Sequence, residues 1–224
     1  MSYRFDFSFV PQYWHLFLEG AQATLLISLA ATLGGFALGT LCAVARTRGP
    51  RWSRRLVTAY VEVFRNTPLL VQIFLVFFGL ASLGLRIDAT TAAIAALIIN
   101  MAAYTSEIVR AGIEATGTGQ MEAASALGLR PAQAMALIVL PPALERVWPA
   151  LASQFVLLML ASSVTSTISV EELTGIANRV QSDTFRPFEV FSIVGGIYLV
   201  LSFLLRGALW LAGRLLFPWR WQAA

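Results

Sequence analysis

Ionisable and polar side chains interrupt two long apolar segments of the sequence, 56–80 and 89–113. An ionisable group inside a membrane-crossing helix is costly, and it normally faces the interior of a helix bundle or an aqueous path. These side chains are therefore candidates for lining the pathway of a polar solute. They are Glu62, Arg65, Thr67, Gln72, Asn100, Tyr104 and Glu107.

The spacing of these residues indicates which of them share a helix face. Asn100, Tyr104 and Glu107 recur after four and three residues, which forms one polar stripe on an otherwise apolar helix. Glu62 and Arg65 are three residues apart, so they can pair with each other on one face. We predict that both segments line the pathway. A structural ion pair is the alternative for Glu62 and Arg65.

Hydroxyl side chains are concentrated between residues 162 and 169, where six of the eight residues are Ser or Thr. Hydroxyl groups on a helix can hydrogen-bond to their own backbone, which is one interpretation. A ligand-contacting or unwound segment is the other, and in that case Ser162 and Ser163 also belong to the pathway.

Residue types needed for catalysis or metal binding are scarce. The chain has one cysteine, Cys42, and one histidine, His15, so neither a paired-cysteine metal site nor a nucleophile–base pair is expected. The sequence contains no P-loop, G-x-S-x-G or H-E-x-x-H motif. We therefore expect a non-catalytic chain that holds no metal or cofactor and cannot hydrolyse ATP by itself. An intramembrane hydrolase that uses a hydroxyl of residues 162–169 is disfavoured for the same reasons.

The composition is that of a membrane protein. Of the 224 residues, 58% are hydrophobic and 12% are charged, whereas soluble domains carry about 25% charged residues. All sixteen basic residues are arginines, and they lie mainly at the ends of apolar segments. This placement indicates orientation in a membrane and not nucleic-acid binding.

Apolar segments of about 20 residues are long enough to cross a membrane as helices. We predict an all-α membrane protein with one domain over residues 1–224 and an amphipathic surface helix over 171–183. Gly35 and Gly39 lie on one face of the first span, which favours close packing against a neighbour; small residues scattered by composition are the alternative in a chain with sixteen glycines. The five predicted spans cover about residues 16–45, 56–80, 89–113, 144–161 and 188–211.

Positive charge predicts the orientation of these spans. Five arginines fall within residues 46–55, directly after the first span, and arginine-rich short loops remain on the cytoplasmic side. With five spans, the N-terminus is expected outside and the C-terminus in the cytoplasm. The segment after the third span is then cytoplasmic as well.

That segment, residues 119–142, is too polar and too interrupted to cross a membrane. Residues 121–127 are good helix formers, Gly128 suits a helix C-terminus, and Pro131 suits the start of a second short helix that ends at the double proline 141–142. We predict an exposed helix–turn–helix suited to contact a soluble partner. An ordinary loop between spans is the alternative.

Seven motifs resemble the permease subunits of polar amino-acid ABC importers, the histidine/glutamine/arginine group. The resemblance extends in order over most of the chain, and the second and fourth motifs are specific in combination. The motifs are TLLISL at 24–29, YVEVFRNTPLLVQ at 60–72, AYTSEIVRAGI at 103–113, GQMEAASALGL at 119–129, IVLP at 138–141, ELT at 172–174 and RPFE at 186–189.

The resemblance implies the type I ABC importer permease fold, with a cytoplasmic coupling loop at 119–142 between the third and fourth spans. In this family the loop is the coupling helix, seated in a groove of the cytoplasmic ATPase. The residues that the resemblance assigns to this coupling are Gly119, Gln120, Glu122, Ala123, Ala124, Leu127 and Gly128.

The resemblance also implies a function, which is ATP-driven import of a polar amino acid across the bacterial inner membrane. The expected partners are two ATPase subunits that hold ATP and Mg²⁺, a second permease that is identical or a sister chain, and a periplasmic or lipid-anchored amino-acid-binding protein. Contact with membrane lipid is expected, and contact with nucleic acid is not.

One departure from the family pattern concerns the substrate. After the pair Gln154-Phe155 the family often carries Lys-Asp before two hydroxyl residues, whereas this chain has Leu160 and Ala161. Because that region borders the transmembrane substrate site in such permeases, the loss of both charges argues against a cationic amino acid bound by this chain. Another amino acid, or a heterodimer with a more active sister subunit, fits the sequence.

A different class of function is an ATPase-independent channel or facilitator for small polar solutes. It accounts for the polar residues within the spans but leaves the exposed helix pair without a role.

Overall fold

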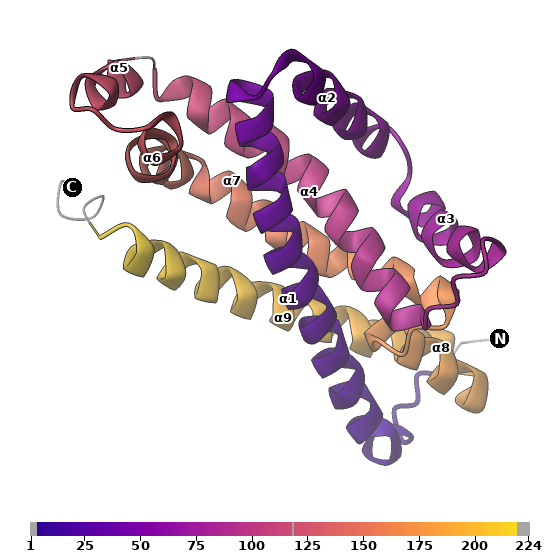
Figure 1. Ribbon diagram of the computed structural model, residues 1–224. Helices are drawn as coiled ribbons and strands as arrows, with labels where there is room; N and C mark the ends of the chain where they lie inside the picture. Colours follow the sequence, from indigo (N-terminus) through magenta and orange to yellow (C-terminus); the bar gives the residue numbers. More distant parts are fainter. Residues whose placement is uncertain (1–3, 118, 219–224) are drawn as a thin grey trace.

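The computed structural model describes residues 4–117 and 119–218, and these residues fold into a bundle of α-helices (Figure 1). The predicted domain over 1–224 also includes residues 1–3, 118 and 219–224, which lie outside the described part. The helices are α1 Val10–Arg48, α2 Arg51–Arg65, α3 Leu69–Ser82, α4 Ala89–Ala115, α5 Gly119–Ala126, α6 Pro131–Ala134, α7 Leu140–Ala161, α8 Leu173–Thr184 and α9 Pro187–Leu216. A π-helical turn, η1 Met135–Val139, joins α6 to α7, and a 3₁₀ helix, η2 Ser162–Ile168, follows α7.

Among the residues that the structure describes, four helical segments are long and apolar enough to cross a membrane, and they correspond to the first, third, fourth and fifth predicted spans. The bent pair α2 and α3 supplies a fifth candidate if the two helices count as one span. The predicted all-α membrane class is therefore confirmed. The four segments are Val10–Arg48, Ala89–Ala115, Pro131–Ile168 and Pro187–Leu216.

The prediction of one helix over 56–80 is wrong, because the segment is broken in its middle. The axes of α2 and α3 differ by 109°. Pro68 explains the break: proline has no backbone N–H, and its ring disfavours helical backbone at the preceding residue, here Thr67. Pro68 itself is extended, with ψ 137°, and the chain becomes helical again at Leu69.

The predicted end of a short helix at the double proline 141–142 is also wrong. α6 continues through η1 into α7, so the fourth span begins at Pro131. In an α-helix, a proline collides with the carbonyl four residues earlier. In η1 the hydrogen bonds reach five residues back, as from the Leu140 N–H to the Met135 carbonyl. This wider turn accommodates the prolines at the start of α7.

Helix α1 crosses the bundle and packs along α4 (Figure 1). A Cβ atom at Gly35 would lie 2.5 Å from Cβ of Met101, and a Cβ atom at Gly39 would lie 2.5 Å from Cβ of Thr105. Only glycine permits this separation of the two backbones, so the predicted close packing through these glycines is confirmed. Leu97 and Val109 of α4 are fully buried in the same core.

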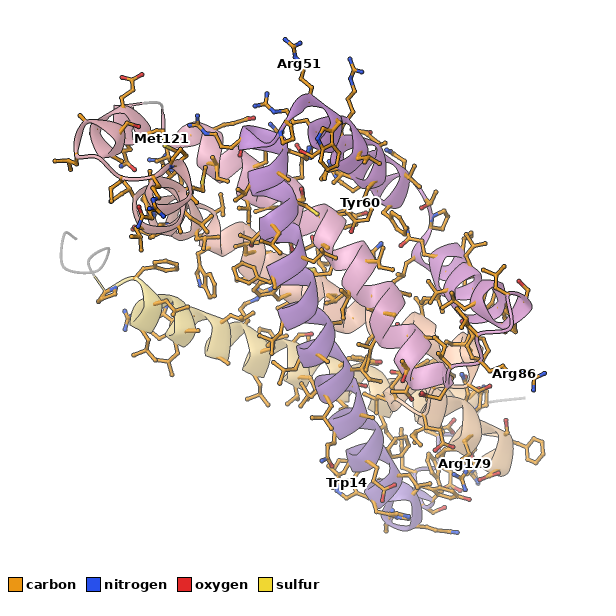
Figure 2. All side chains as sticks on the ribbon, in the orientation of Figure 1. Trp14, Arg51, Tyr60, Arg86, Met121 and Arg179 are labelled. Atoms are coloured by element: carbon orange, nitrogen blue, oxygen red, sulfur yellow. The ribbon has the colours of Figure 1, made fainter. Side chains whose placement is uncertain are left out.

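The two ends of the bundle carry different elements. The C-terminal end of α1, the start of α2 and the α5–α6 hairpin lie at one end, where Arg51 projects outward (Figures 1 and 2). Helix α8 lies at the other end, with Arg179 and Trp14 (Figure 2). The arginine-rich loop and the hairpin are thus on the same side, as the predicted number of spans requires.

Candidate translocation pathway and coupling hairpin

A cavity of about 420 Å³ lies where the break between α2 and α3 faces the middle of α4 and the C-terminal half of α7. Three of the predicted pathway residues, Thr67, Asn100 and Tyr104, are in its wall. The cavity therefore joins residues that are far apart in the sequence. Its complete wall consists of Thr67, Pro68, Leu69, Asn100, Tyr104, Gln154, Leu157, Leu158 and Ala161.

Gln72, also predicted for the pathway, lies behind this wall and holds the break in place. Its amide nitrogen donates to the Phe64 carbonyl at 2.8 Å, to the Thr67 carbonyl at 3.0 Å and to Thr67 Oγ1 at 2.8 Å. Its amide oxygen accepts from Asn100 Nδ2 at 2.9 Å. The buried Gln72 thus satisfies carbonyls freed at the end of α2 and connects the break to α4.

Glu107 is the centre of an ion-pair network next to the cavity. Its carboxylate contacts Arg46 of α1 at 2.6 Å, Arg65 of α2 at 3.7 Å, and Arg110 one turn further along α4. The Arg65 guanidinium also lies over the Tyr104 ring, 5.7 Å from its centroid. The Glu107 carboxylate therefore connects α1, α2 and α4. The spacing of polar residues along α4 alone does not reveal these partners.

The possible ion pair between Glu62 and Arg65 does not form. Arg65 turns toward Glu107, while the Glu62 carboxylate accepts from Asn66 Nδ2 at 3.2 Å at the exposed end of α2. A partly buried carboxylate attracts a guanidinium more strongly than an exposed one, because water screens it less. Glu62 is exposed and does not belong to the cavity wall.

The hydroxyl-rich segment forms η2, and its hydroxyls bond to the backbone. Ser162 Oγ donates to the Met159 carbonyl and Ser163 Oγ to the Leu160 carbonyl, each at 2.7 Å. Neither serine is in the wall of the cavity. The local interpretation of these hydroxyls is therefore the one that the structure supports.

One functional candidate was missed in the sequence, and another was noted only as a departure from the family pattern. Gln154 and Ala161 of α7 are both in the cavity wall. A lone amide in an apolar span was a signal for Gln154, but nothing in the sequence indicates that it faces Asn100 and Tyr104. Leu160, at the other departure from the family pattern, does not belong to the wall.

A second missed residue is Glu172, at the start of the predicted surface helix. It is fully buried and accepts from Tyr198 Oη at 2.7 Å, from the Gly175 N–H at 2.9 Å and from Thr24 Oγ1 at 3.4 Å. Glu172 lies in the connection between two spans, and burial raises its pKa above the ordinary value. It caps α8 and connects that helix to α1 and α9.

The hairpin of α5 and α6 has a well-defined turn and an open surface. Gly128 has φ +77°, and the Leu129 N–H donates back to the Ala124 carbonyl at 3.1 Å, which is a typical glycine helix end. Ala124 is buried, whereas Leu127 is 81% exposed. The remaining residues assigned to coupling, Gly119, Gln120, Glu122, Ala123 and Gly128, are exposed. Met121 packs inward against the core, next to α6 (Figure 2).

Comparison with known proteins places this arrangement in a family. Residues 35–212 match the family model described as "Binding-protein-dependent transport system inner membrane component". The chain is 37% identical to the glutamine transport system permease protein GlnP of Escherichia coli (strain K12), over 91% of this chain and 95% of the relative. It is 41% identical to the probable glutamine ABC transporter permease protein GlnM of Bacillus subtilis (strain 168), over 84% of this chain and 87% of the relative.

A solved structure agrees with these sequence matches. The crystal structure of an amino acid ABC transporter with histidines superposes with a TM-score of 0.84 and 37% identity, covering 95% of this chain and 99% of the matched chain. The resemblance derived from the motifs is thereby confirmed. The chain belongs to the inner membrane components of binding-protein-dependent transport systems, in the group of non-catalytic permease subunits of amino-acid ABC importers.

Proposed function

We propose that this chain conducts a polar amino acid through the cavity at the break between α2 and α3. The cavity lies beside apolar spans, yet its wall contains amide and hydroxyl groups. In transporters, broken helices often place half-helix ends at the solute. Leu69, the first residue of α3, is part of the cavity wall. The positive end of the α3 helix dipole therefore lies at the cavity, where it favours the α-carboxylate of an amino acid. Relatives named for glutamine support an amino-acid substrate.

The observation that carries the coupling proposal is the continuity of the fourth span. The exposed hairpin leads through α6 and η1 directly into α7, which contributes Gln154 and Ala161 to the cavity. A displacement of α5 and α6 by a cytoplasmic ATPase is therefore transmitted along one helix to the cavity wall. We assign ATPase docking to the exposed hairpin residues, with Leu127 as the apolar anchor.

The complete importer, in this proposal, contains an ATPase pair that binds ATP and Mg²⁺, a second permease that is a copy or a sister chain, and an amino-acid-binding protein. The hairpin and the arginine-rich loop face the cytoplasm. The N-terminus and α8 face the outside, where the binding protein delivers the solute. The positive-inside distribution of arginine supports this orientation.

The test is to tag the chain in its native host, extract it in mild detergent and identify the proteins that co-purify. We expect an ABC ATPase; a second, similar permease indicates a heterodimer, and its absence indicates a homodimer. Uptake of amino acids by proteoliposomes should require both the ATPase and ATP. Transport that persists without any ATPase would overturn the proposal in favour of a channel or facilitator.

A further inference from the structure

The polar groups that face the cavity are uncharged, and several of them lack a partner. Within residues 4–117 and 119–218, Gln154 makes no hydrogen bond or ion pair, and the Tyr104 hydroxyl makes no hydrogen bond, while the Arg65 guanidinium lies over the Tyr104 ring. Asn100 donates its N–H to Gln72, which leaves its carbonyl oxygen available. An amide, a phenol and a carbonyl can therefore hydrogen-bond to a ligand.

The charged groups nearest to the cavity are engaged with one another. Glu107 is paired with Arg46, Arg65 and Arg110, and none of these four residues belongs to the wall. Thr67 accepts from Gln72 and donates to the Val63 carbonyl at 2.8 Å. The wall itself therefore offers a ligand side chain neither a carboxylate nor a guanidinium.

A wall with neutral polar groups and no charged groups favours an uncharged polar side chain on the substrate. A charged side chain transferred from water into this cavity loses hydration and gains no counter-ion from the wall, which is unfavourable. A carboxamide or hydroxyl loses less hydration and regains hydrogen bonds from neutral donors and acceptors. The cavity volume of about 420 Å³ accommodates a side chain of this size beside the apolar surfaces of Leu157 and Leu158.

We propose that the cavity of this chain selects an amino acid whose side chain is polar and uncharged, and that Gln154 is the specificity-determining residue. This inference rests on the proposed function. Gln154 is suited to the role because its amide offers both a donor and an acceptor. The chemical class of the ligand is thus a neutral carboxamide or hydroxyl amino acid, in preference to a cationic or anionic one.

The experiment measures binding to the purified importer without its binding protein, so that the selectivity of that protein does not enter. Radiolabelled L-glutamine, L-arginine and L-glutamate are the probes. We expect wild type to bind glutamine at least about tenfold more tightly than either charged amino acid. Tighter binding of arginine or glutamate than of glutamine would overturn the inference.

Gln154→Glu sharpens the test because it adds a charge at nearly constant volume. We expect the preference between arginine and glutamine to shift toward arginine by about tenfold or more, since a carboxylate attracts a guanidinium. An unchanged preference would overturn the role of Gln154. Gln181→Glu in α8 is the matched control and should leave all three affinities unaltered. Ala161→Asp places a carboxylate at a second wall position and serves if Gln154→Glu does not assemble.

These measurements distinguish a failure of the selectivity inference from a failure of the proposed function. ATP-driven uptake of a charged amino acid, with arginine or glutamate bound best, would leave the importer assignment intact and refute only the inference. Absence of ATP-dependent uptake of every amino acid tested would refute the proposed function itself.

Discussion

The α1–α4 interface and the α5–α6 hairpin use glycine for opposite purposes. At Gly35 and Gly39, an added Cβ would lie 2.5 Å from an atom of α4, whereas at Gly119 and Gly128 it would meet nothing within 4 Å. The interface glycines permit contact between backbones, and Gly128 permits a left-handed turn. The interface is therefore fixed by packing, while the hairpin keeps an exposed surface.

The largest loss of stability is expected from a substitution that forces α1 and α4 apart. In Gly39→Leu the new side chain collides with Thr105 and with the Ala102 carbonyl. We expect a destabilisation of about 3 kcal/mol or more and loss of most of the folded protein, measured by size-exclusion chromatography and thermal unfolding in detergent. Gly207→Leu, at a position with no atom within 4 Å, is the control. Equal yields of the two variants would show that the interface is not closely packed.

Disruption of the ion-pair network around Glu107 should lower the stability less than Gly39→Leu does. Glu107→Gln removes the carboxylate shared by three arginines, and we expect a loss of about 1–3 kcal/mol in stability because their charges remain partly buried. Thermal unfolding measures it. Glu114→Gln, at the 58% exposed end of the network, should cost under about 1 kcal/mol. A larger cost for Glu114→Gln than for Glu107→Gln would contradict the central position of Glu107.

The pH dependence of stability tests whether Glu172, at the α8 end of the bundle, is buried in the folded protein. The pKa of Glu172 is higher in the folded protein than in the unfolded chain because the carboxyl is buried. Its favourable contribution is therefore complete below the unfolded pKa, about 4.3, and is lost as the pH rises through the folded value. Glu172→Gln should make the unfolding temperature less dependent on pH above the unfolded pKa of about 4.3. An unchanged pH dependence would indicate that this carboxyl is hydrated.

The smallest effect on stability is expected in the hairpin. Leu127 is 81% exposed, so Leu127→Ala should change the free energy of unfolding by no more than about 0.5 kcal/mol. If Leu127 anchors the ATPase, the same variant should lower ATP-driven uptake severalfold. Leu199→Ala in α9, where the side chain is 59% exposed, controls for loss of exposed apolar surface. Normal uptake by Leu127→Ala would remove Leu127 from the docking surface.

Local features of the sequence predicted the fold well. Apolar length located the spans, Gly35 and Gly39 indicated the close helix pair, and Gly128 indicated the end of α5. Each of these depends on neighbouring residues only. The break at Pro68 was hidden because a hydropathy average over 56–80 does not register a single missing N–H. The continuity of α6 with α7 was missed because a π turn accommodates the prolines.

The site was predicted only in part, because its contacts join distant helices. The polar stripe correctly identified Asn100, Tyr104 and Glu107 as neighbours. Their partners depend on tertiary structure: Arg65 meets Glu107 and not Glu62, and Gln72 meets Asn100. Gln154 faces the same cavity from another span, which the sequence of that span does not show.

The coupling claim is tested most directly by Gly128→Asp in the complete importer. Nothing lies within 4 Å of a Cβ at this position, and Asp is among the residues that tolerate a left-handed conformation, so folding and membrane insertion should be retained. The added charge and the altered turn should disturb ATPase docking. With the complex assembled in proteoliposomes, the measurement is amino-acid uptake per ATP hydrolysed. We predict that ATP hydrolysis no longer drives uptake; near-normal uptake by this variant would contradict the assignment of the hairpin as the coupling element.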